Sequence, residues 1–183
     1  IFYDRLIGKI WTLENNTPTY AKWGGATGNY HTFEVINNKS SIIGMVERFF
    51  SNYKEVRLSI VSTQIQDHDY IAHLNHALVR INNVIQDLNQ DMWLYISNDI
   101  FKLKLNKDEV GSSTMPHKVN PIDFENSEGN LGLSNALLLF IAEKLPKSRL
   151  QRDLSDSTVL RNIGVAFGYA LLGFISSLKG LNK

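Results

Sequence analysis

One polar stretch, residues 111–121, carries most of the side chains in this sequence that could do chemistry. It reads GSSTMPHKVNP. Lys118 and Asn120 supply a cation and an amide suited to a carboxylate, whereas the hydroxyls of Ser112 and Ser113 become basic only where an alkoxide is stabilised. Because two prolines prevent a continuous helix through the stretch, we expect a loop between helices, where functional groups are commonly carried.

A second polar cluster lies at residues 148–162 and includes Arg152, Ser157 and Arg161. Arginines beside hydroxyls at the start of a helix are suited to binding a phosphate group. Helix capping and surface ion pairs would account for the same residue types. The sequence alone leaves both interpretations open.

Two shorter stretches also contain unusual residues. Three glycines within residues 24–28 indicate either a tight turn with a close backbone approach or a plain connection between helices. Residues 62–70 precede the longest periodic segment, so they are typical of a helix N-terminus, where His68 and Asp69 would cap the helix or form surface hydrogen bonds.

Long helices must position these polar stretches. Apolar residues recur every three or four positions, the helical spacing, in three long segments, near residues 70–98, 123–144 and 158–179. The same spacing predicts shorter helices near residues 1–13 and 40–52, and residues 55–63 are extended or irregular. We therefore predict an all-α fold, a bundle of nearly antiparallel long helices, with no sheet of consequence. We expect residues 1–183 to form one domain, with the 111–121 loop outside the bundle. Asp123 is expected to cap its helix, whose apolar residues bury it almost all round.

Composition excludes several classes of protein. The chain has 183 residues, 43% of them hydrophobic and 20% charged, and a net charge of +1, which argues against nucleic-acid binding. The absence of cysteine excludes disulfides and Cys-based metal sites, and fits a reducing compartment. His73 and His76 have no evident third metal ligand. We expect no metal, no cofactor and no membrane span.

Several motifs resemble one enzyme family. The pattern G-S-S-x-M-P-x-K-x-N-P at residues 111–121 resembles the signature of the fumarase/aspartase superfamily, and residues 122–130 are similar to the bacterial type of adenylosuccinate lyase. Residues 25–29, residues 63–71 and the R-xxxx-S-xxx-R run that contains Arg152 and Arg161 resemble the same family. The resemblance covers about residues 20–183.

This resemblance implies a fold, an activity and an assembly. It implies the central helical domain of a cytoplasmic homotetramer with shared active sites. The enzyme would cleave adenylosuccinate to AMP and fumarate, and succinylaminoimidazole carboxamide ribotide to its carboxamide and fumarate, in purine biosynthesis without a cofactor. Argininosuccinate lyase or fumarase activity is an alternative, which the phosphate-type cluster disfavours. A catalytically silent helical scaffold is another.

The resemblance also implies residue roles. The catalytic set comprises Ser112 as the base, with Ser113 as second choice, Lys118 as the electrostatic stabiliser, and Glu125, which in the family pairs with a histidine of another subunit. The substrate-binding set comprises Gln64, Met115, Asn120, Arg152, Ser157 and Arg161. The family's upstream T-H-x-Q-P-A segment and C-terminal helical domain have no counterpart in this sequence. We therefore expect this chain to be part of a longer polypeptide, on which its activity depends.

Overall fold

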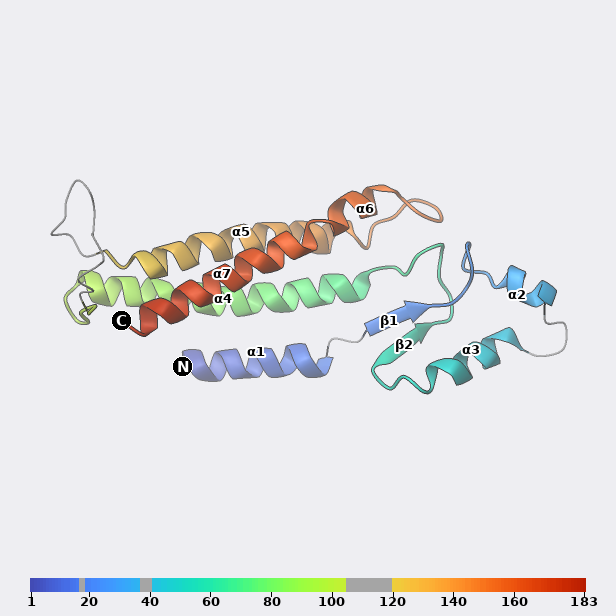
Figure 1. The fold of residues 1–183 in the computed structure, drawn as a ribbon, viewed down its shortest axis with the longest axis horizontal. Helices are drawn as coiled ribbons and strands as arrows, with labels where there is room; N and C mark the ends of the chain where they lie inside the picture. The colour runs from blue at the N-terminus through green and yellow to red at the C-terminus, as the bar shows by residue number, and fades with distance from the viewer. Residues whose placement is uncertain (17–18, 37–40, 105–119) are drawn as a thin grey trace.

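Three long helices lie side by side and dominate the structure (Figure 1). The computed structural model describes residues 1–16, 19–36, 41–104 and 120–183. The long helices are α4 (Asp69–Ser97), α5 (Ile122–Lys144) and α7 (Ile163–Leu181), and α1 (Phe2–Asn16) packs along α4. The sequence predicted α4 and α5 to within one residue at each end, and the all-α prediction is confirmed.

The third predicted helix, residues 158–179, is wrong as a single element. It is divided into α6 (Ser155–Leu160) and α7, with a turn at Arg161 and Asn162. The Asn162 side chain donates a hydrogen bond to the Thr158 carbonyl at 3.1 Å. The backbone carbonyl of Asn162 accepts a hydrogen bond from the backbone N–H of Ala166 at 3.0 Å. Asn162 thus closes one helix and opens the next, which residue spacing alone does not reveal.

A smaller region precedes α4 and contains the strands β1 (Thr19–Lys22) and β2 (Val56–Ser59), paired in parallel, and the helices α2 (His31–Ile36) and α3 (Ile42–Phe50). A small core of Tyr30, Ile42 and Val46 holds it together. The extended segment near 55–63 and the helix near 40–52 were predicted. The sequence analysis did not predict β1 or α2.

A row of buried amides joins the long helices. Its members lie seven residues apart on α4 and are fully buried: Asn75, Asn82 and Asn89. Asn89 donates to the Ser127 hydroxyl at 2.8 Å, which donates to the Gly173 carbonyl at 2.7 Å, and Ser177 donates back to Asn89 at 2.7 Å. Because Asn89, Ser127 and Ser177 meet at only one alignment of the helices, these bonds fix the register of α4, α5 and α7.

Replacing Asn89 by alanine should lower the free energy of unfolding by roughly 2–4 kcal/mol, because it leaves a cavity, the buried Ser177 hydroxyl without its acceptor and Ser127 without one of its two bonds. Asn83→Ala is the matched control on the same helix, since Asn83 is exposed and accepts one bond from Asn135. Urea denaturation of both variants measures the difference. Equal effects would contradict a stabilising role for the buried row.

Close contact between α5 and α7 depends on small residues of α7. A Cβ added at Gly173 would lie 2.6 Å from the Leu131 side chain, and one at Gly180 would lie 2.8 Å from the Phe124 ring. Leu131 and Phe124 are fully buried. Glycine at these two positions therefore lets the large side chains of α5 approach the α7 backbone.

Asp123 has a different role from the one predicted. It lies inside the first turn of α5 rather than at its cap, and its carboxylate pairs with Lys179 Nζ at 3.0 Å and Lys183 Nζ at 2.7 Å. Burial raises the pKa of Asp123, but the hydrogen bonds and charges of Lys183 and Lys179 outweigh burial and bring the pKa below its usual value. The carboxylate therefore joins the first turn of α5 to the end of the chain.

A carboxyl whose pKa is lower in the folded state stabilises the fold above its unfolded pKa, and this stabilisation is lost as the pH falls through the folded value. Asp123→Asn should therefore lower the free energy of unfolding at neutral pH by roughly 1–3 kcal/mol. The difference from wild type should shrink below about pH 4. Urea denaturation across this range measures it, and a difference independent of pH would contradict the ion-pair account.

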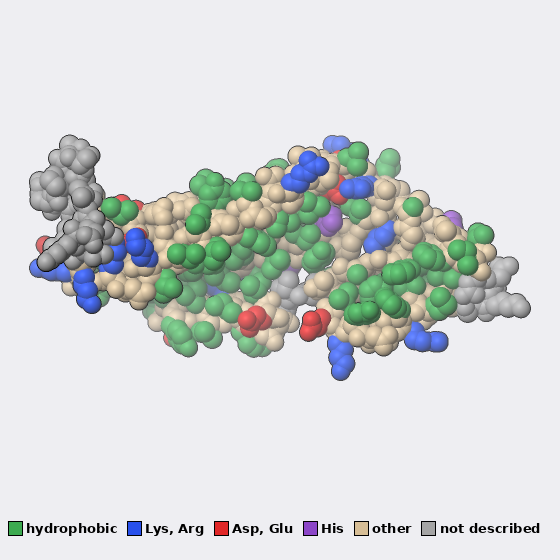
Figure 2. All heavy atoms as spheres, in the orientation of Figure 1, with side chains coloured by type: hydrophobic (Ala, Val, Ile, Leu, Met, Phe, Trp, Pro, Cys, Tyr) green, Lys and Arg blue, Asp and Glu red, His purple; other side chains and the backbone are tan. Residues whose placement is uncertain are grey.

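The outward side of α5 and α7 is strongly apolar. Figure 2 shows hydrophobic side chains gathered along this part of the bundle. The large exposed apolar side chains on these helices are Ile122, Leu133, Leu139, Phe140, Val165, Leu171, Leu172, Ile175, Leu178 and Leu181. The prediction that α5 is buried almost all round is therefore wrong for one copy of the chain.

By length and composition alone, the segment Ser155–Leu181 could cross a membrane, with a mean hydropathy of 1.5 and 17% of its most apolar window buried. The sequence analysis did not anticipate this. Core helices of soluble bundles meet the same criterion, and α7 packs its small residues tightly against α5. The exposed apolar side of α7 is also what a helix between two protein copies would present.

Candidate active site

Gln64 lies in the exposed segment that leads from β2 into α4. Its backbone is held by Lys22, the last residue of β1, whose ammonium group donates to the carbonyls of Gly25 at 2.8 Å, Thr63 at 3.0 Å and Gln64 at 2.6 Å. Burial lowers the pKa of Lys22 from its usual value. Lys22 thus ties the glycine turn to the segment that carries Gln64.

The glycine turn at residues 24–28 approaches the same segment closely. This agrees with the first of the two sequence interpretations, a tight turn with a close backbone approach. Gly28 has a φ of +76°, and a Cβ there would lie 2.1 Å from the Ser62 carbonyl oxygen. Just after the turn, the Tyr30 hydroxyl donates to the Ile60 carbonyl at 3.0 Å. The turn is therefore part of the support for Gln64 rather than a plain connection.

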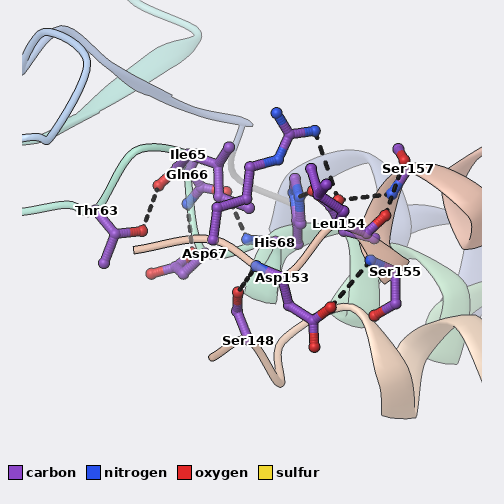
Figure 3. A network of polar contacts seen from close by, with 12 residues as sticks. Thr63, Ile65, Gln66, Asp67, His68, Ser148, Asp153, Leu154, Ser155 and Ser157 are labelled. Atoms are coloured by element: carbon purple, nitrogen blue, oxygen red, sulfur yellow. Dashed lines mark hydrogen bonds and ion pairs between the residues drawn. The ribbon is translucent and has the colours of Figure 1, made fainter. Parts of the chain in front are cut away.

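The segment entering α4 lies beside the connection between α5 and α6 (Figure 3). Within that connection the Asp153 backbone donates to Ser148 Oγ at 2.9 Å, and the Asp153 carboxylate accepts from the backbone of Ser155 at 3.0 Å. The bonds from Ser155 lower the pKa of Asp153. On the other side, the His68 backbone donates to the Gln66 side chain at 2.7 Å. Polar contacts thus order both segments where they meet.

The phosphate-type cluster lies on and around α6. Arg152 Nη2 is 3.5 Å from Asp156 Oδ1, and the Arg152 side chain is 32% exposed. The Ser157 hydroxyl donates to the Leu154 carbonyl at 2.9 Å, as a residue at a helix start commonly does, so it must rotate to donate to a ligand. Arg161 is exposed at the end of α6, and its side chain forms no hydrogen bond or ion pair with another described residue. Two cations are therefore accessible to an anion at this end of the bundle.

Glu125 and Asn120 lie at the other end of the bundle. Glu125 is exposed in the first turn of α5, where Trp93 Nε1 donates to its carboxylate at 2.9 Å. Asn120 is half-buried just before α5. Four other predicted site residues fall outside the described part of the chain: Ser112, Ser113, Met115 and Lys118.

The predicted site residues that the structure describes therefore form two groups far apart in one chain. Gln64 precedes the first residue of α4, Asp69, whereas Glu125 contacts Trp93 near the last turn of α4. At 1.5 Å per residue, roughly 36 Å of helix separates Asp69 from Trp93. One chain does not bring Glu125 to Gln64.

Known proteins resemble this chain over nearly all its length. A family model described as Lyase matches residues 12–135, and one described as Adenylosuccinate lyase C-terminal matches residues 148–183. The adenylosuccinate lyase of Dictyostelium discoideum is 49% identical over 100% of this chain, and that of Escherichia coli K12 is 50% identical over 92%. The chain belongs to the adenylosuccinate lyase family of the fumarase/aspartase superfamily.

This chain spans 40% of the length of the Dictyostelium adenylosuccinate lyase and 37% of that from E. coli. The adenylosuccinate lyase of Buchnera aphidicola subsp. Schizaphis graminum is 52% identical over the whole chain, which again covers 40% of the relative. The Lyase match includes Gln64 and Glu125, and the C-terminal match includes Arg152 and Arg161. Both groups of site residues thus lie in regions shared with adenylosuccinate lyases.

Two residues of this region were missed in the sequence analysis. Lys22 precedes the glycine turn, and only the fold reveals that its ammonium group reaches Gln64. Asp156 lies inside the polar cluster around α6, and nothing in the neighbouring sequence indicates that its side chain is buried. A charged residue next to a glycine turn and an acidic residue among arginines were the available hints.

Proposed function

We propose that the full-length protein is a cytoplasmic adenylosuccinate lyase of purine biosynthesis. It cleaves adenylosuccinate to AMP and fumarate, and succinylaminoimidazole carboxamide ribotide to its carboxamide and fumarate. The observation that carries the proposal is the match to the adenylosuccinate lyase C-terminal model, which spans the Arg152–Arg161 cluster. Argininosuccinate and fumarate have no phosphate for such a cluster to bind.

The reaction is a β-elimination, and the residue types suit its steps. A base removes a proton from the carbon next to a carboxylate, and negative charge develops on that carboxylate. Ser112 is the proposed base, with Ser113 as the alternative, and Lys118 and Asn120 stabilise the developing charge. Met115 contacts the substrate from the same loop. Glu125 orients a histidine supplied by another subunit.

Arg152, Ser157 and Arg161 form the proposed nucleotide phosphate subsite. The two arginines supply charge-assisted hydrogen bonds, for which their guanidinium groups are accessible. Gln64 contacts the substrate from the neighbouring segment, where Lys22 holds its backbone. Figure 3 shows that the segment around Thr63 and Gln66 lies beside the connection around Asp153 and Leu154. Support for this assignment is that these two segments contain Gln64 and Arg152.

We further propose a homotetramer whose active sites are shared between subunits. Roughly 36 Å of α4 separates the Gln64 end from the Glu125 end, so a site that uses both needs residues from more than one copy. The exposed apolar side of α5 and α7 supports the same assembly, because a second copy would bury it. Residues such as Leu172 and Phe140 would then become core residues of the assembly.

The test is fumarate release by the full-length protein, followed by ultraviolet absorbance. Adenylosuccinate should be cleaved, whereas argininosuccinate should not be cleaved and fumarate should not be hydrated. Cleavage of argininosuccinate or hydration of fumarate would assign a different activity of the superfamily. No reaction with any of the three by folded, full-length protein would support the silent scaffold instead.

A further inference from the structure

Asp156 is a buried carboxylate that the proposed mechanism leaves unused. It lies in the first turn of α6 and is 5% exposed. Buried carboxylates require charged or hydrogen-bonding partners. Asp156 meets such groups from two elements: the guanidinium of Arg152, just before α6, and the imidazole of His68, at the start of α4.

The contact with Arg152 leaves much of the guanidinium free for a ligand. Asp156 Oδ1 lies 3.5 Å from Arg152 Nη2, and the Arg152 side chain remains 32% exposed. Arginine carries five N–H donors in a planar fork. The carboxylate thus restrains one corner of the fork, while about a third of the Arg152 side chain stays accessible to a ligand.

The contact with His68 reaches the segment that carries Gln64. His68 Nε2 lies 3.9 Å from Asp156 Oδ2, and both ring nitrogens are buried without a hydrogen-bond partner among the described residues. The backbone of His68 has a φ of +65°. Its carbonyl accepts a hydrogen bond from the backbone N–H of Ile71 at 2.9 Å, which joins His68 to the first turn of α4. The oriented imidazole thus faces the carboxylate.

A negative charge next to a phosphate subsite weakens phosphate binding by repulsion, unless the same group also improves the geometry of the binding residues. A long arginine side chain loses much rotamer freedom when it binds a ligand, and a partner that orders it beforehand reduces that loss. Asp156 offers such ordering to Arg152 and links it to the other side of the subsite through His68.

We infer that Asp156 is a positioning residue of the nucleotide phosphate subsite, which holds Arg152 and His68 so that Arg152 and Gln64 keep a fixed spacing. This inference rests on the proposed function of that subsite. A purely structural alternative exists, because Asp156 Oδ1 also accepts from the Ser157 backbone at 2.6 Å. Asparagine at this position preserves that bond and removes only the charge.

The test uses Asp156→Asn in the full-length protein, with Glu143→Gln as the control for the same chemical change in an exposed ion pair. Asp156→Asn should raise KM for adenylosuccinate and Kd for AMP about tenfold, the effect of one weakened charge-assisted contact, while kcat stays within about threefold. The control should change none of these values. Unchanged KM and Kd in a folded Asp156→Asn protein would overturn the inference.

A double-mutant cycle separates positioning from general stabilisation. If Asp156 acts through Arg152, adding Asp156→Asn to Arg152→Ala should not weaken AMP binding further, whereas independent effects would multiply. If Asp156→Asn does not fold, His68→Gln takes its place, with an expected rise in Kd of about threefold or more. An unchanged Kd in that variant would overturn the inference. Failure of the wild type to release fumarate would overturn the proposed function instead, and AMP affinity would still decide the role of Asp156.

Discussion

Ser112→Ala in the full-length protein should lower kcat by about 10² to 10⁴-fold, because general-base catalysis contributes a factor of this size. The substitution removes the group that takes the proton, whereas substrate contacts made by other residues remain. Substrate binding should therefore survive, since the lost interaction acts mainly in the transition state. Steady-state kinetics of fumarate release, together with the affinity for AMP, measures both effects.

Ser113→Ala is the matched control, because it removes a hydroxyl from the adjacent position of the same loop. It should retain most of kcat if Ser112 is the base. A large loss in Ser113→Ala with a nearly normal Ser112→Ala would move the role by one residue. If neither substitution lowers kcat, the serine-base mechanism is wrong for this protein.

Arg161→Ala should raise KM for adenylosuccinate by about 10 to 100-fold, because it removes a charge-assisted contact to the phosphate group. The Arg161 side chain is exposed and has no partner among the described residues, so its loss should leave the free energy of unfolding nearly unchanged. Steady-state kinetics and urea denaturation measure the two quantities.

Arg149→Ala is the control for Arg161→Ala. Arg149 belongs to the same polar cluster, but its side chain is 87% exposed and faces Asp153 at 3.1 Å. Loss of this surface ion pair should change neither KM nor kcat. An unchanged KM in Arg161→Ala would make the cluster a set of helix caps and surface pairs, the alternative that the sequence left open.

The long helices could be predicted because one side of each packs against neighbours. In α4, apolar residues every three or four positions coincide with the buried side, where Ile71, Ile81 and Val84 lie. In α7, apolar residues occur on all sides, and this composition hides the break that Asn162 creates. The missed strand β1 has four residues, and its partner β2 lies far away in the sequence.

The candidate site was predictable by residue type and not by geometry. Sequence motifs identified Gln64, Arg152 and Glu125 as site residues. The length of α4 places Glu125 at the end of the bundle opposite to Gln64. Support residues such as Lys22 and Asp156 act through contacts between segments distant in the sequence. The spacing of residues within a short stretch of sequence does not predict such contacts.

Mixing two inactive variants tests the shared active site most directly. One carries Glu125→Ala and the other carries both Arg152→Ala and Arg161→Ala, so each damages one of the two separated groups. If each site takes the two groups from different copies, about one quarter of the sites in random mixed assemblies are intact. The mixture should then regain about one quarter of the wild-type rate of fumarate release, measured at a substrate concentration near the wild-type KM. Activity no higher than the average of the two parent variants, in assemblies verified as mixed, would contradict the account.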